Sequence, residues 1–105
     1  MPREAMMMIR SELIRKIDAI AAATGKISLA ALLEQMDAIR RTARQYGMDA
    51  VEGVASMIET AAAYHGHGPV ILSYLDLMRD AVDCEDQGVH ARTTYTAAVA
   101  LRLGA

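Results

Sequence analysis

The chain has 105 residues, which is the length of one domain. Its net charge is −2, so basic residues are not in excess. This charge disfavours general binding to nucleic acid or to an anionic membrane surface. The single cysteine, Cys84, excludes an internal disulfide and indicates a reducing compartment. No apolar run approaches the ~20 residues of a membrane span, so we expect a cytoplasmic protein with no membrane partner.

The first predicted helix begins near a run of three methionines and ends at Gly25, since glycine readily adopts the left-handed conformation that closes a helix. Apolar residues recur in it at steps of three and four, which is typical of one buried helix face. They are Met6, Ile9, Leu13, Ile17 and Ile20. The methionines make the start apolar on several sides. Two alternatives follow: residues 1–8 form a mobile tail, or this end packs on a second molecule.

The second and third predicted helices are joined by a short turn at Gly47. Ser28 is a good residue to cap the start of the second helix, and Asp49 with Glu52 has the spacing of a capping pair for the third. The third helix is predicted to end at about His65. Its buried stripe comprises Val51, Val54, Ala55, Ile58 and Ala62.

The fourth predicted helix starts at Pro69, which suits the first helical turn, and the fifth runs from about residue 89 to 103. We expect four side chains of the fourth helix to face the core, namely Ile71, Leu75, Met78 and Val82. Leu72 and Leu77 add apolar surface beyond that stripe. Short connections make neighbouring helices antiparallel. The sequence therefore predicts an all-α fold, an antiparallel bundle of four to five helices, in one domain over residues 1–105.

Residues 63–70, "AYHGHGPV", carry the candidate metal ligands His65 and His67. A zinc site needs three or four converging ligands. The other candidates, Cys84 and His90, follow the fourth helix, which spans about 20 Å at 1.5 Å per residue. One chain therefore cannot bring both groups to one metal, and a turn between two helices is the favoured interpretation. A metal-dependent protein with a histidine site shared between chains is an alternative; for the chain alone we expect no metal or other cofactor.

Residues 42–57, "TARQYGMDAVEGVASM", resemble part of a helix-turn-helix, because Ala43 and Gly47 have the spacing of that motif. The resemblance implies a DNA-binding regulator that reads DNA with the second helix of the pair. Gly53 and Ser56 stand where the motif usually has apolar packing residues, and this helix has acidic residues and no Lys or Arg. Phosphate would be repelled there. DNA binding is therefore kept as an alternative, with nucleic acid a disfavoured partner.

No pattern typical of nucleophilic catalysis or of nucleotide binding occurs in the chain, and the acidic residues around Cys84 should make its thiol a poor nucleophile. We expect no catalytic activity. Surplus apolar positions instead indicate a contact surface, and methionine suits adaptable contacts. The predicted interface residues are Met6, Met7, Ile14, Leu72 and Leu77. The interpretation is a small interaction or regulatory module that self-associates, most simply as a homodimer, or that binds another protein.

Overall fold

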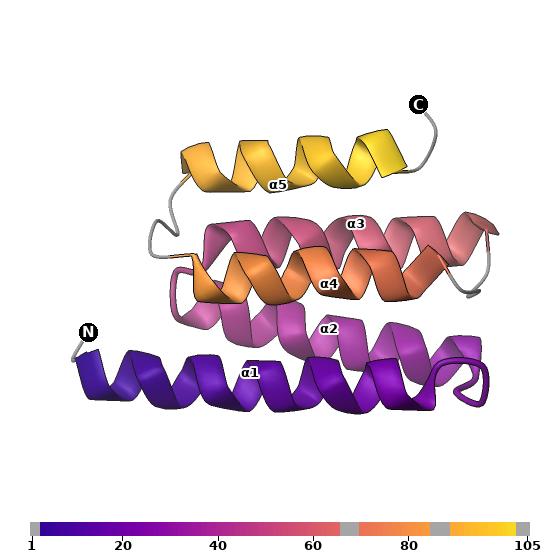
Figure 1. The fold of residues 1–105 in the computed structure, drawn as a ribbon, viewed down its shortest axis with the longest axis horizontal. Helices are drawn as coiled ribbons and strands as arrows, with labels where there is room; N and C mark the ends of the chain where they lie inside the picture. The colour runs from indigo at the N-terminus through magenta and orange to yellow at the C-terminus, as the bar shows by residue number, and fades with distance from the viewer. Residues whose placement is uncertain (1–2, 66–69, 85–88, 103–105) are drawn as a thin grey trace.

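Five α-helices follow one another in the computed structural model, which describes residues 3–65, 70–84 and 89–102 (Figure 1). No strand occurs within those ranges, so the predicted all-α class is confirmed. The helices are α1 (Arg3–Ala23), α2 (Leu29–Gln45), α3 (Asp49–His65), α4 (Val70–Asp83) and α5 (Val89–Arg102).

The helix ends follow from local chemistry. The Ser28 hydroxyl accepts a hydrogen bond from the Ala31 backbone amide at 3.1 Å, and so caps the start of α2 as predicted. Gly25 and Gly47 follow α1 and α2 with φ angles of 92° and 68°, a conformation that favours glycine. These turns are short, and consecutive helices run antiparallel (Figure 1).

The first four helices form a ring, in which α1 contacts α2 and α4, and α3 contacts α2 and α4. The diagonal pairs, α1 with α3 and α2 with α4, make no close backbone approach within the described ranges. Helix α5 lies against α3 and α4 on the far side from α1, and it runs in the same direction as α3 (Figure 1). Helix α3 is therefore packed by three neighbours, whereas α1 is packed by two.

The buried core matches the predicted stripes of α3 and α4, since every residue expected to face inward there is buried. Tyr74 is also fully buried, which the stripe of α4 did not indicate. The structure corrects one expectation for the same helix. Leu77 is only 9% exposed and belongs to the chain's own core, whereas Leu72 is 42% exposed. Among the described side chains of α4, the extra apolar surface is thus limited to Leu72.

Helix α5 packs closely on α3 at Gly53. A β-carbon built there would lie 2.8 Å from Thr96 Cγ2 and 2.9 Å from Arg92 Cγ, both closer than side chains normally approach. Glycine at position 53 therefore allows the two helices to come this near.

Residues 3–8, for which a mobile tail was one alternative, form the first turns of α1. Arg10 contacts Cys84, the residue after the end of α4, so the residues of α1 before Arg10 lie beyond that end. Figure 1 shows the same arrangement: the N-terminal end of α1 extends past the ends of the other helices.

Candidate functional site

The orientation of α1 is set by an apolar stripe and two polar contacts to α4. Leu13, Ile17 and Ile20 are buried in the core. The Arg10 guanidinium donates from Nη2 to the Cys84 carbonyl at 3.2 Å, and Arg79 Nη1 lies 2.5 Å from Asp18 Oδ1. The Arg10 contact lies near the buried stripe of α1, whereas Asp18 lies about 140° around the helix from Leu13, so Arg79 of α4 reaches the edge of the opposite side. The rest of that opposite side faces away from the bundle.

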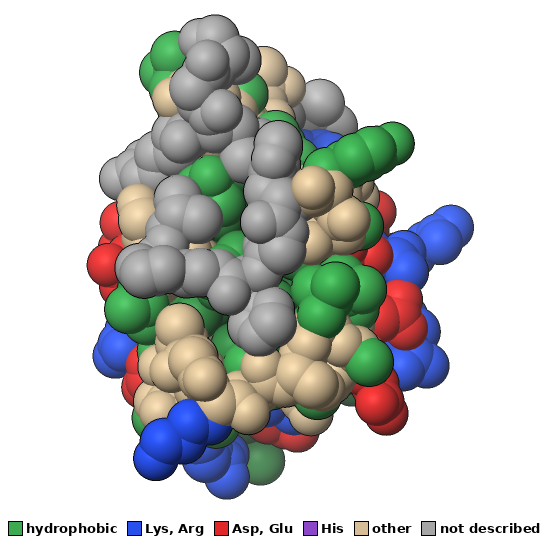
Figure 2. Space-filling view, turned by 90° about the vertical axis from the view of Figure 1, so that its right-hand side faces the viewer, with side chains coloured by type: hydrophobic (Ala, Val, Ile, Leu, Met, Phe, Trp, Pro, Cys, Tyr) green, Lys and Arg blue, Asp and Glu red, His purple; other side chains and the backbone are tan. Residues whose placement is uncertain are grey.

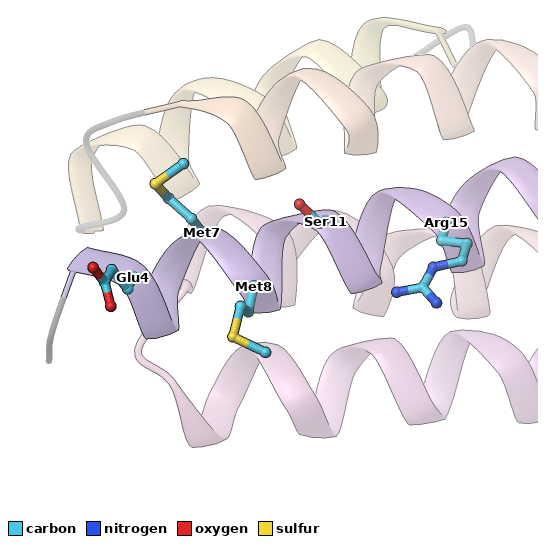
Figure 3. Close-up of a pocket in the computed structure, with 5 residues that line it drawn as sticks. All are labelled: Glu4, Met7, Met8, Ser11 and Arg15. Atoms are coloured by element: carbon cyan, nitrogen blue, oxygen red, sulfur yellow. The ribbon is translucent and has the colours of Figure 1, made fainter.

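This outward side carries two exposed methionines. Met7 is 57% exposed and Met8 is 73% exposed, and they lie on either side of a line of polar residues. A shallow hollow on this face is lined by Glu4, Met7, Met8, Ser11 and Arg15 (Figure 3). All five come from α1, at steps of three and four that keep them on one helix face. We call these five residues the α1 face.

The two charges of the α1 face stand at its opposite ends and are exposed. Neither Glu4 nor Arg15 forms an ion pair with any residue in the described part of the chain. Two carboxylates nearby have partners within the chain: Glu12 pairs with Lys16 at 3.7 Å, and Asp18 pairs with Arg79. The α1 face thus has an apolar middle and two unmatched charges of opposite sign.

The structure separates the predicted interface residues into different places. Met7 lies on the α1 face, while Met6 and Ile14 are half-buried against the core. Leu72 lies near the start of α4, at the other end of the molecule from Met7 (Figure 1), and Leu77 is buried. The predicted set therefore does not form one surface.

Met8, the more exposed of the two methionines, was absent from the predicted interface. A signal for it was present in the sequence. At 100° per residue, Met8 lies about 140° around the helix from Leu13, the centre of the buried stripe. No single neighbouring groove could have covered both positions.

A second group of exposed apolar side chains lies at the end of the molecule where α3 ends and α4 begins. Its members are Tyr64, Leu72 and Leu101, each from a different helix. Figure 2 looks at this end and shows hydrophobic atoms next to atoms that are not described. The described residues alone do not define a continuous surface here.

The candidate metal ligands that the structure describes lie at one end of α4. His67 and the side chain of His65 lie outside the described residues, although residue 65 is the last of α3. Half-buried Cys84 and exposed His90 lie at the opposite end of α4, about 20 Å away at 1.5 Å per residue. Within the described ranges, no group of three His, Cys, Asp or Glu residues could hold a metal ion.

The helix-turn-helix resemblance falls on α2 and α3, and α3 would be the helix that enters the DNA groove. Such a helix needs an exposed face with basic or neutral side chains. Here α3 is packed by α2, α4 and α5, and two of its half-buried acids pair within the chain: Glu52 with Arg92 at 3.3 Å and Glu59 with Arg40 at 3.4 Å. Hydrogen bonding to Asp37, together with the charge of Glu59, raises the pKa of the Arg40 guanidinium. This arrangement gives no support to the DNA-binding alternative.

A small polar cluster joins α4 and α5 through Tyr95. Burial raises the pKa of the Tyr95 hydroxyl, and the nearby Cys84 and Asp80 raise it further. The hydroxyl is therefore held in its neutral form, as a structural group between two helices.

None of the described helices is both long enough and apolar enough to cross a membrane. Comparison with family models, with curated proteins and with solved structures found no match for this chain.

Proposed function

We propose that this protein is a small helical interaction module of the cytoplasm, without catalytic activity, that self-associates as a homodimer through the α1 face. The observation that carries the proposal is the exposure of Met7 and Met8, which are neighbours in sequence on the outward side of α1. Adjacent exposed methionines are typical of adaptable contact surfaces. A small domain has a limited core of its own, and pairing two copies would bury this surplus.

The size of the α1 face indicates how strong the association would be. The α1 face extends about 16 Å along the helix from Glu4 to Arg15, and a contact stripe about 10 Å wide covers roughly 160 Å² per copy. A standard stable interface buries about 800 Å² per partner. The pairing is therefore expected to be weak and dependent on concentration, with a dissociation constant in the micromolar range.

The cytoplasmic assignment is supported by the lone cysteine, which is half-buried. A module of this kind can also use the same face for another protein. A second copy is the simplest occupant because most closed assemblies of identical chains are two-fold dimers.

The test is light scattering across a dilution series with two matched variants. Met7→Glu/Met8→Glu places charges in the apolar middle of the α1 face, and should leave a monomer at all concentrations. Leu72→Glu makes the same kind of change on α4, outside the face, and should dimerise like the wild type. A wild type that stays monomeric at high micromolar concentration would refute the proposal. A dimer that survives the methionine variant but is lost with Leu72→Glu would place the interface elsewhere.

A further inference from the structure

We infer that the two copies pair with their α1 helices antiparallel, in the register that sets Glu4 of each copy against Arg15 of the other. This inference rests on the proposed self-association and adds its geometry. It follows from the positions of the two unmatched charges on the α1 face.

The spacing of these charges suits one straight contact. Glu4 and Arg15 are 11 residues apart, close to three full turns of an α-helix, so they point in nearly the same direction about 16 Å apart along the axis. Both are exposed on the face that turns away from the bundle. A second helix lying along this face would meet both charges.

The sign of the charges selects the direction of that second helix. In a parallel two-fold pair, Glu4 would face Glu4 of the second copy and Arg15 would face Arg15 of the second copy. Like charges would then face each other. In an antiparallel two-fold pair each Glu4 meets an Arg15, and the symmetry makes this contact twice. The α1 face is therefore complementary to itself only in the antiparallel direction.

The same register brings the methionines to the middle of the contact. When Glu4 opposes Arg15, the two-fold axis passes between residues 9 and 10. Met7 and Met8 then lie within one helical turn of the axis, and Met8 is opposite Ser11 of the second copy. An apolar centre with ion pairs at both ends is the usual organisation of a protein interface.

Two neighbouring carboxylates already have partners, whereas exposed Arg3, beside Glu4, forms no ion pair within the described part of the chain. Glu12 is matched by Lys16 and Asp18 by Arg79 within the same chain. Glu4 and Arg15 are the charges lining the α1 face, and both lack an ion pair within the described part of the chain. A second copy supplies a partner for each.

The experiment is a charge swap measured by sedimentation equilibrium at low ionic strength, because salt screens exposed ion pairs. Glu4→Arg and Arg15→Glu should each weaken the dimer about tenfold, since each change affects two symmetric pairs. The double variant Glu4→Arg/Arg15→Glu should return the dissociation constant to within about threefold of the wild type. Glu34→Arg, the same change at an exposed position of α2, is the control and should leave the dimer unchanged.

The outcomes separate the two claims. Circular dichroism first checks that each variant keeps the helical content of the wild type, because Glu4 also favours the start of α1. A monomeric wild type overturns the proposed function, and the inference falls with it. A dimeric wild type whose double variant is no stronger than the weaker single variant overturns the antiparallel register alone. Recovery in the double variant supports both.

Discussion

Replacing Gly53 with alanine tests how α5 is held on the bundle. In an unpacked helix this change stabilises the helix by up to about 1 kcal/mol, because alanine has the higher helix propensity. Here the new methyl group would lie 2.8 Å from Thr96 Cγ2 and 2.9 Å from Arg92 Cγ. The flexible arginine can move aside, but the branched threonine has little freedom.

The expected magnitude follows from these two opposing effects. Forcing an extra methyl group into a packed seam typically costs about 1–3 kcal/mol. After the gain in helix propensity, Gly53→Ala should lower the free energy of unfolding by about 1 kcal/mol. For a domain of about 100 residues this corresponds to a fall in Tm of roughly 4–8 °C.

A second substitution shows whether Thr96 is the cause. Thr96→Ser removes Cγ2 but keeps the hydroxyl, which donates to the Arg92 carbonyl at 2.9 Å. In that background Gly53→Ala should cost little or become stabilising. Thermal and urea unfolding of the wild type, both single variants and the double variant give the coupling, expected at about 0.5–2 kcal/mol. A Gly53→Ala variant as stable as the wild type would refute the described packing of α5. An equal loss of unfolding free energy on Gly53→Ala with and without Thr96→Ser would refute it too.

Three further predictions concern stability. Ser28→Ala should cost about 1 kcal/mol in urea unfolding, because it removes the hydroxyl that caps α2, while Ser28→Asp should retain most of that stability; equal loss in both would argue against the cap. Met36→Ala, at a fully buried position of α2, should cost about 2–5 kcal/mol, and a loss below 1 kcal/mol would contradict its burial. For Tyr95, the pKa is raised in the folded state, so the folded chain holds this proton more tightly than the unfolded chain, whose tyrosines titrate near pH ~10. Stability from this group is full below pH ~10 and is lost as pH rises through the folded pKa; Tyr95→Phe should flatten that alkaline decline in urea unfolding, and an unchanged profile would contradict the assigned environment.

The helices were predictable because the signals that define them are local. The periodic stripes of α3 and α4, the cap at Ser28 and the glycines at 25 and 47 depend only on neighbours in sequence. Antiparallel order followed from short connections. These features needed no knowledge of which helices touch.

The burial of individual side chains at the edges of the stripes could not be predicted, because it depends on how many neighbouring helices each helix has. Leu77 is buried because α4 is contacted by α1, α3 and α5, and three neighbours cover a wider arc than one stripe suggests. Met8 is exposed because α1 has only two neighbours, both on its bundle side. The packing of α5 against α3 at Gly53 was also not predictable, since a glycine within a helix gives no indication of which residues pack against it. A periodic pattern shows which side of a helix is apolar, but not how much of its circumference other helices cover.

Sedimentation equilibrium of the wild-type chain over a wide range of concentration tests the central claim most directly. A chain of 11.4 kDa that pairs weakly through α1 should show an average mass that rises from that value toward twice that value as concentration passes through the micromolar range. The curves should fit a monomer–dimer equilibrium without larger species, because a two-fold pairing of one face is closed. A mass that stays at 11.4 kDa up to high micromolar concentration, or one that grows without limit, would contradict the account.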